Sequence, residues 1–246
     1  MAVTTASGKR HVPWPVEFYR SAIGKKWVMA VTGVIWLGFV LAHMIGNLKV
    51  YLGYLPDRAA YEIDLYGESL RSLLFPIFPD HVVLWTLRLV LIGALVLHVH
   101  AAYSLTVMNR HARQVAYQGP RQYLVANYAS RTMRWSGVLV LLYLGWHLAD
   151  FTWGVGPFAP AGWQQGAIYD NFVASFSRAP VAILYVVANL ALGLHLYHGA
   201  WSLFQSLGVN NPRFNPWRRY FAIGFASLIV VANVSFPIAV LTGIVS

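Results

Sequence analysis

The chain contains no cysteine, and only 11% of its residues are charged, against about 25% in soluble proteins. Without thiols it forms no disulfide and cannot by itself ligate an iron–sulfur cluster or a cysteine-rich zinc site. It also lacks a P-loop, a G-x-G-x-x-G turn, a G-x-S-x-G elbow and an H-E-x-x-H helix, so the sites that these motifs build are not expected. Any chemistry must therefore use histidines, aromatic residues and a few charged groups.

Long apolar runs account for most of the sequence, in which 58% of the residues are hydrophobic. A helix needs roughly 20 apolar residues to cross a hydrocarbon core of about 30 Å. The runs that reach this length span residues 27–50, 82–108, 134–154, 180–207 and 218–244. No signal-peptide h-region precedes Trp27. We therefore expect an all-α fold: one membrane domain over residues 1–246, a polytopic bundle of five transmembrane helices. Residues 57–75, with apolar Leu65, Leu70, Leu73 and Leu74, predict a short amphipathic helix in an outer loop.

The net charge of +10 is distributed unevenly between the two predicted sides of the membrane. Thirteen basic residues fall on one side: Lys9, Arg10, Arg20, Lys25, Lys26, Arg110, Arg113, Arg121, Arg131, Arg134, Arg213, Arg218 and Arg219. Seven of the eight acids fall on the other: Asp57, Glu62, Asp64, Glu68, Asp80, Asp150 and Asp170. The positive-inside rule then places the N-terminus in the cytoplasm and the C-terminus outside. The charge indicates topology, and no nucleic-acid partner is expected.

Histidines occur in four of the five apolar segments: His43 in the first, His98 and His100 in the second, His147 in the third, and His195 and His198 in the fourth. A charged side chain in a bilayer costs at least about 2.5–3.5 kcal/mol, so such residues suggest a functional site. At 1.5 Å per residue, the expected topology places His43 and His147 toward the outside and the others toward the cytoplasm. Two stacked pairs of histidines on four helices are suited to two b-type haems.

The surplus histidines leave alternatives open. His98 and His100 point about 200° apart on a helix, so only one can face a given ring. His195 and His198 share a helical face, which permits a non-haem iron centre whose thiolates come from a partner chain. A single membrane histidine is also commonly an interhelical hydrogen-bonding group. The remaining three, His11, His81 and His111, lie outside the segments or at their ends, where we expect them to be solvated.

Several stretches resemble a known family. They are S-A-I-G-K-K-W-V-M-A-V-T-G-V (21–34), F-V-L-A-H-M-I-G-N-L (39–48), L-H-V-H-A-A-Y-S (97–104), G-W-H-L-A-D-F (145–151) and L-H-L-Y-H-G-A-W-S (194–202). They look like the membrane subunit of succinate dehydrogenases and fumarate reductases, more narrowly the single-chain, five-helix, di-haem cytochrome b kind found in bacteria. The resemblance covers nearly the whole chain, and it is specific in the first four apolar segments and loose in the fifth.

The resemblance implies particular haem ligands. The family's first ligand matches His43, and its third, in a G-W-H pattern, matches His147. The second ligand is followed by a small residue and an aromatic, which matches His100 rather than His98. The fourth stands six residues before a Trp, which matches His195 rather than His198. The implied arrangement is an outer haem on His43 and His147 and an inner haem on His100 and His195.

The family's function would follow. Flavoprotein and iron–sulfur subunits on the cytoplasmic side oxidise succinate, and this chain, which has no succinate site, relays their electrons to a membrane quinone. It would be the membrane anchor of a succinate:quinone oxidoreductase (respiratory complex II) in a bacterial cytoplasmic membrane. A small additional membrane subunit or a homo-oligomer of the complex would be compatible with it. The inner arginine-rich loops would face the partner subunit or anionic lipid.

Other residues have weaker indications. Arg88 lies near the outer histidines and would either pair with a haem propionate or snorkel to the surface. Arg20, Ser21 and Lys25, at the inner entry to the first helix, would bind a quinone headgroup or serve as interfacial anchors. Finally, Glu62, Asp64, Glu68 and Asp150 border the outer tier, where a proton relay competes with a role in the outer loop.

Three other functions compete with this one. A di-haem b anchor of another dehydrogenase, such as a formate dehydrogenase or a hydrogenase, would use similar histidines. The same anchor could hold a histidine-ligated iron–sulfur centre with partner cysteines instead of haem. A transporter or structural anchor would use the histidines for protons, but the broken helices and inverted repeat that favour transport are not seen in the sequence.

Overall fold

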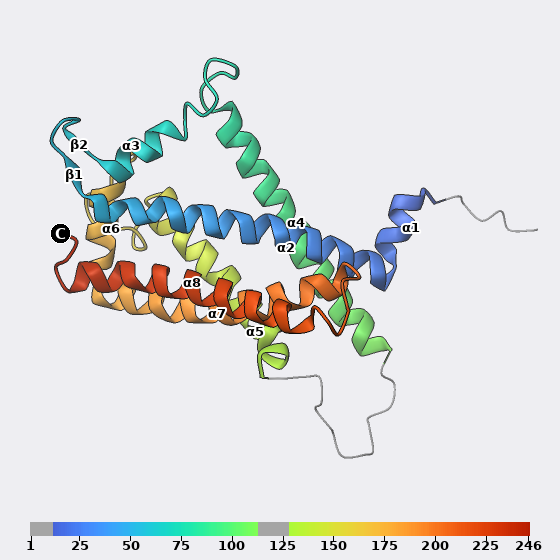
Figure 1. Cartoon of the computed structure of the whole chain (residues 1–246). Helices are drawn as coiled ribbons and strands as arrows, with labels where there is room; N and C mark the ends of the chain where they lie inside the picture. Colours follow the sequence, from blue (N-terminus) through green and yellow to red (C-terminus); the bar gives the residue numbers. More distant parts are fainter. Residues whose placement is uncertain (1–11, 113–127) are drawn as a thin grey trace, which may run out of the picture.

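The computed structural model describes residues 12–112 and 128–246 (Figure 1). Lys9, Arg10, His11, Arg113 and Arg121 lie outside this range. Long helices dominate: α2 (Ala22–Asn47), α4 (Val82–His111), α5 (Tyr128–His147), α7 (Ala179–Ser206) and α8 (Asn215–Leu241). The shorter elements are α1 (Trp14–Arg20), the 3-10 helix η1 (Leu48–Leu52), strands β1 (Tyr54–Leu55) and β2 (Ala60–Tyr61), α3 (Glu62–Ser69), the π-helix η2 (Leu148–Thr152) and α6 (Ile168–Phe176).

Four helices in the described residues are long and apolar enough to cross a membrane: α2 with η1, α4, α7 and α8. Their bounds lie within five residues of the ranges expected from hydropathy. The chain is therefore a helical membrane protein. The predicted segment 134–154 corresponds to α5 followed by η2, and a fifth span there stays a prediction, as does the orientation in the membrane.

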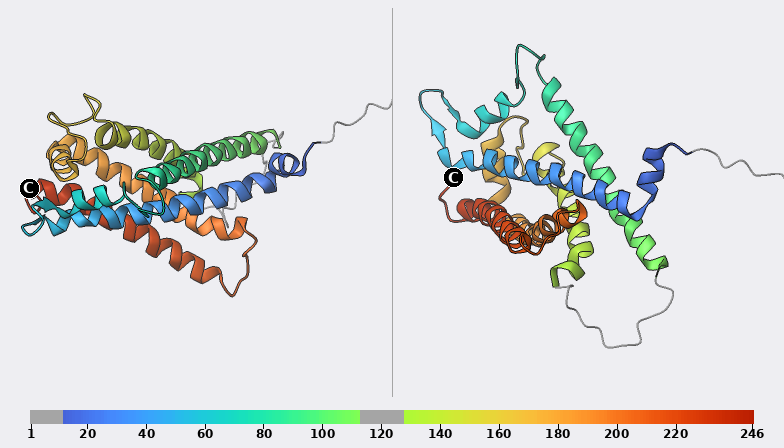
Figure 2. Two further views of the ribbon diagram at one scale, coloured as in Figure 1. Left: turned by 90° about the horizontal axis from the view of Figure 1, so that it is seen from above. Right: turned by 45° about the vertical axis from the view of Figure 1, so that its right-hand side comes forward.

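The long helices form a layered bundle (Figure 2). Helices α7 and α8 lie side by side, α2 contacts both of them, α5 packs against α7, and α4 packs against α2. Small and apolar residues fill the centre, where Met44 of α2, Leu196 of α7 and Ile229 of α8 are buried together. A polar link crosses between α7 and α8, since Asn233 Nδ2 donates to Asn189 Oδ1 over 2.9 Å. The outward faces carry exposed Leu, Ile and Val side chains, as expected where lipid is the solvent.

A cap of short elements covers the end of the bundle that holds the C-terminus (Figure 1). The hairpin of β1 and β2, α3 and α6 surround an aromatic core in which Tyr61 and Tyr169 stack with ring centroids 3.7 Å apart. The prediction of an amphipathic helix over residues 57–75 is correct only for Glu62–Ser69. The hairpin lies before this helix, and after Ser69 the chain continues in turns, with a left-handed backbone at Leu74 (φ 63°).

A tight corner joins α1 to α2 at the opposite end. Ser21 caps α2, because its Oγ accepts from Gly24 N at 2.9 Å while donating to the carbonyl of Phe18. The buried Lys25 donates to the carbonyl oxygens of Tyr19 and Arg20, at the C-terminal end of α1. The corner therefore fixes α1 against α2.

Candidate functional site: two histidine pairs across the bundle

We name His43 and His147 the outer pair after their predicted depth, and this pair joins α2 to α5. The rings of His43 and His147 lie with centroids 5.8 Å apart and nearly perpendicular, at 88°. Phe39, one turn before His43, stacks on its ring at 5.3 Å. The two histidines that sequence depth placed in the outer tier are thus neighbours in the structure.

The inner pair, named in the same way, joins α4 to α7, and its members differ from those that the resemblance implies. His98, not His100, faces His195, with ring centroids 6.5 Å apart. His100 instead hydrogen-bonds to the hydroxyl of Tyr19 on α1 and stacks on that ring. The physical reason is the rotation of α4, which packs on α2 so that His98 contacts Thr32 and His100 points toward α1. The residue that the sequence treated as the alternate therefore occupies the inner position.

The two pairs are separated along the bundle axis by similar lengths of helix. Thr32, which touches His98, precedes His43 by 11 residues of α2. Ser136, which touches His195, precedes His147 by 11 residues of α5. At 1.5 Å per residue both helices give a spacing of about 16 Å. The pairs therefore divide a hydrocarbon core of about 30 Å into shorter steps.

Each inner histidine has a hydroxyl at its Nδ1 atom. Thr32 Oγ1 lies 3.1 Å from Nδ1 of His98 and donates its own proton to the carbonyl of Val28. Ser136 Oγ lies 3.4 Å from Nδ1 of His195 and donates to the carbonyl of Met133. Because each hydroxyl proton is engaged elsewhere, the hydroxyl oxygen accepts and Nδ1 carries the hydrogen. Nε2 is then the nitrogen with a free lone pair.

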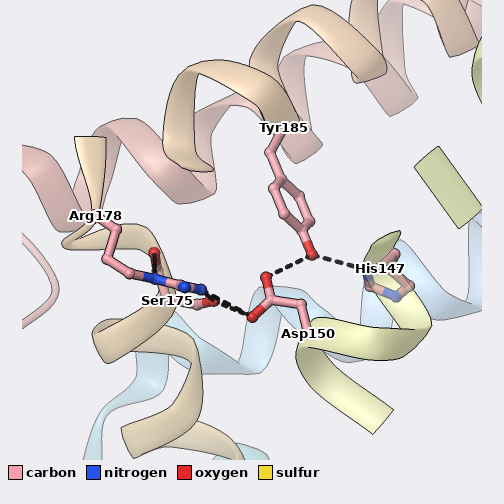
Figure 3. Close-up of polar contacts among 5 residues, drawn as sticks. All are labelled: His147, Asp150, Ser175, Arg178 and Tyr185. Carbon is pink, nitrogen blue, oxygen red and sulfur yellow. Dashed lines mark hydrogen bonds and ion pairs between the residues drawn. The ribbon is translucent and has the colours of Figure 1, made fainter. Parts of the chain in front are cut away.

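The outer His147 has the same arrangement, backed by a buried carboxylate (Figure 3). Tyr185 donates its phenolic proton to Oδ2 of Asp150 at 2.9 Å, and its oxygen lies 3.4 Å from Nδ1 of His147. Asp150 lies in the π-helix η2, and its side chain is fully buried. Its Oδ1 atom accepts from Arg178 Nη2 at 3.0 Å and from Ser175 Oγ. These contacts leave Nε2 of His147 with the free lone pair as well.

The three hydroxyl partners are not among the predicted site residues, although a repeated sequence pattern marks two of them. A hydroxyl followed by glycine stands 11 residues before an outer histidine in both α2 (Thr32-Gly33) and α5 (Ser136-Gly137). The glycines lie beside the imidazoles: a Cβ on Gly33 would lie 3.8 Å from His98 Cε1, and one on Gly137 would lie 3.4 Å from His195 Cε1, both ordinary van der Waals distances. The pair α2 and α4 therefore shows the same arrangement as the pair α5 and α7: a hydroxyl on the first helix contacts a histidine on the second.

Other predicted site residues lie elsewhere. Arg88 is exposed and stacks on Trp85, with its Cζ atom 5.0 Å from the ring centroid, an arrangement that fits surface snorkelling. Arg20 is exposed at the α1–α2 corner, while the donors of Ser21 and Lys25 serve that corner. His198 lies beside Trp201, and its buried Nδ1 atom has no partner among the described residues.

Several of the predicted charged residues at the two ends of the bundle contact other parts of the protein. In the outer cap Glu62 pairs with Lys49 at 2.7 Å, and Asp64 Oδ1 accepts from the backbone N–H of Tyr169. The contact with Lys49 lowers the pKa of Glu62. Glu68 is exposed. At the inner end Arg218 is buried and donates to the carbonyl of Val209, so this member of the arginine-rich loops braces the α7–α8 connection.

The pairs suit a group that needs two axial ligands. A metal between two imidazoles places the ring centres about 6.3 Å apart, from bonds of about 2.0–2.1 Å and about 1.1 Å from each nitrogen to its ring centre. The observed centroid separations are 5.8 and 6.5 Å. Within residues 12–112 and 128–246 no cluster of three or more His, Asp or Glu can hold a metal ion alone. The two centroid separations lie on either side of the distance expected for a group held by two axial imidazoles, of which haem is one example.

Fold and site together define a class, a helical membrane protein in which two histidine pairs join neighbouring helices, with His43 exposed and His98, His147 and His195 partly exposed. Comparisons with protein-family models, with curated proteins and with solved structures found no match to this chain.

Proposed function

We propose that the chain is the membrane anchor of a succinate:quinone oxidoreductase and carries electrons on two b-type haems. The observation that carries this proposal is the two facing histidine pairs, at ring separations of 5.8 and 6.5 Å, stacked along the bundle. The haem ligands would be His43 and His147 in the outer site and His98 and His195 in the inner site. Quinone would be the substrate, and flavoprotein and iron–sulfur subunits would be the partners on the cytoplasmic side of a bacterial membrane.

The haems, when bound, supply one-electron redox chemistry that no side chain of this sequence supplies. The chain's own residues would bind the haems and orient the histidine ligands. The histidines provide Nε2 lone pairs, and the hydroxyls of Thr32, Ser136 and Tyr185 fix the ring orientation through Nδ1.

The depth of the inner pair favours haem over an iron–sulfur centre shared with a partner. His98 lies 13 residues before the end of α4 at His111, and His195 lies 11 residues before the end of α7 at Ser206. These lengths correspond to about 20 and 17 Å of helix. Cysteines of a subunit docked on the membrane surface would not reach that depth.

The same site geometry fits a di-haem anchor of another dehydrogenase. What distinguishes the two readings in this chain is the sequence around the histidines, L-H-V-H-A-A-Y and L-H-L-Y-H-G-A-W, which resembles the succinate dehydrogenase family. For a transporter, buried histidines that handle protons need access to water. The close apposition of the rings in both pairs instead favours a shared ligand.

The deciding experiment is purification of the complex through a tag on this chain, followed by a pyridine haemochromogen assay and a flavin assay. We expect two b-type haems per chain, co-purified flavin and succinate-dependent quinone reduction. Absence of haem, with iron and sulfide in excess of the partner's clusters, would replace the haem assignment by a shared cluster. Two haems with a molybdenum or nickel partner in place of flavin would assign the anchor to another dehydrogenase.

A further inference from the structure

The two histidine pairs differ in what lies behind their hydrogen bonds. In the inner pair the hydroxyls of Thr32 and Ser136 pass their protons to backbone carbonyls, which are neutral. In the outer pair Tyr185 passes its proton to the carboxylate of Asp150. The sequence predicts for Asp150 either a proton relay or a role in the outer loop, and it does not single out Tyr185.

The carboxylate is held firmly within the protein. The side chain of Asp150 has no exposed surface, and both of its oxygens accept hydrogen bonds. Three residues supply the donors: Ser175 from α6, Arg178 just before α7, and Tyr185 two turns into α7 (Figure 3). The π-helix η2 places Asp150 three residues after His147, on the side of the ring that carries Nδ1.

The carboxylate of Asp150 ends a series of hydrogen bonds that runs from His147 through Tyr185. It changes the electronic properties of the histidine. When Asp150 attracts the phenolic proton, the oxygen of Tyr185 becomes a stronger acceptor for Nδ1–H of His147. The imidazole then donates more electron density through Nε2, which favours the oxidised state of a bound metal. Arg178 forms an ion pair with the carboxylate and partly offsets its charge, but it contacts Asp150 through Oδ1 and not through the oxygen that faces Tyr185.

We propose that Asp150, acting through the hydroxyl of Tyr185, lowers the reduction potential of the metal group held by His43 and His147. Tyr185 is the positioning residue of His147, and Asp150 sets the strength of its hydrogen bond. The inference rests on the proposed function, because it concerns the outer haem. One carboxylate, that of Asp150, would then account for the difference between two otherwise similar histidine pairs.

The test is a spectroscopic redox titration of the purified complex with Tyr185→Phe, Asp150→Asn and the double variant. Each single variant is expected to shift the outer haem toward reduction by three- to tenfold in its equilibrium constant, where tenfold is about 59 mV for one electron. The reduction potential of the inner haem should not change. When Asp150→Asn is added to Tyr185→Phe, the reduction potential of the outer haem should change little further, because the connecting hydroxyl is absent.

Two controls make the titration specific. Tyr143→Phe removes a hydroxyl from a ring that also contacts His147, at 5.8 Å, without a hydrogen bond to Nδ1, and it should leave both potentials unchanged. Thr32→Val should move only the inner haem, which assigns the two steps of the titration. Electron paramagnetic resonance of the oxidised complex should show a change confined to the outer low-spin signal.

Several outcomes would overturn the inference. One is a Tyr185→Phe complex with full haem content and an unchanged outer potential. Another is an Asp150→Asn shift that is equally large with and without Tyr185, which would show only the loss of a nearby charge. If Asp150→Asn does not assemble, Tyr185→Phe alone decides, since it leaves the Asp150–Arg178 ion pair in place. A wild-type complex without haem would overturn the proposed function as well, and haem content, not potential, would reveal it.

Discussion

The hydroxyl of Thr32 lies 3.1 Å from Nδ1 of His98, and it gives its own proton to the carbonyl of Val28, 2.7 Å away. A residue of α2 thereby determines which nitrogen of a histidine on α4 carries the hydrogen. This contact also selects between the two histidines of α4, because His100, two residues later, turns toward Tyr19 instead.

The first prediction concerns that selection. His98→Ala should leave one haem per chain, because the ring of His98 lies across the bundle from that of His195. His100→Ala should retain two haems, since its contacts are with Tyr19. The pyridine haemochromogen assay on both purified variants makes the comparison, with His43→Ala as a reference for loss of the outer haem. Loss of a haem in His100→Ala and retention of both in His98→Ala would restore the assignment implied by the family resemblance.

The second prediction concerns Thr32 itself. Thr32→Val keeps the shape of the side chain and removes the acceptor for Nδ1–H, so it should weaken binding of the inner haem by about 10–100-fold, as is typical when a ligand's hydrogen-bond partner is lost. Thr32→Ser keeps the hydroxyl and should bind haem normally. Haem retention during dilution and gel filtration measures the difference. Equal retention in the two variants would show that the hydroxyl does not orient the ligand.

Much of the fold follows from the sequence, because long apolar segments leave few alternatives. The helix from Ala179 to Ser206 was expected over residues 180–207, and the pairing of His43 with His147 follows from their depth. The choice of His98 does not follow. It depends on the rotation of α4 about its own axis, which is set by packing against α2, and hydropathy is too uniform around that helix to indicate it.

The outer cap and the hydroxyl partners could not be predicted from the sequence, for two different reasons. The cap consists of pieces of two to nine residues, whose pairing depends on contacts such as Tyr61 on Tyr169, over 100 residues apart. The hydroxyl partners are single Ser, Thr and Tyr residues, which are common in membrane helices and usually bond to their own backbone. Only the repeated hydroxyl–glycine pattern at Thr32-Gly33 and Ser136-Gly137 distinguishes two of them.

The third prediction concerns the α1–α2 corner. A Cβ on Gly24 would lie 1.9 Å from the carbonyl oxygen of Phe18, a backbone atom that can move only with α1. Gly24→Ala should therefore destabilise the protein by about 1–3 kcal/mol, as overpacking does. Thermal unfolding in detergent measures this loss. Gly224→Ala on α8, where a Cβ meets nothing within 4 Å, is the matched control and should leave the melting temperature unchanged or slightly raised. A similar melting temperature for both variants would contradict the packing of α1 against α2.

The fourth prediction concerns the pH dependence of the outer cap. Burial raises the pKa of Asp64 above its ordinary value of 3.8, and the neighbouring Asp170 raises it further, although the backbone N–H of Tyr169 acts in the opposite direction. Because the folded state holds this proton more tightly than the unfolded state, Asp64 contributes stability at low pH. That contribution is lost as the pH rises from about 4 through the raised pKa. Asp64→Asn keeps an acceptor for Tyr169 N–H and carries no charge, so it should flatten this part of the stability profile and raise the melting temperature near pH 7.

Melting temperatures of wild type and Asp64→Asn, measured from about pH 4 to pH 7, test the sign of this effect. The exposed Glu68 lies on the same helix, so Glu68→Gln is the control for loss of a surface charge, and it should keep the wild-type slope. A melting temperature of Asp64→Asn that falls below that of the wild type near pH 7 would mean that the carboxylate stabilises the cap. The contact with Tyr169 N–H would then outweigh the cost of burying the charge.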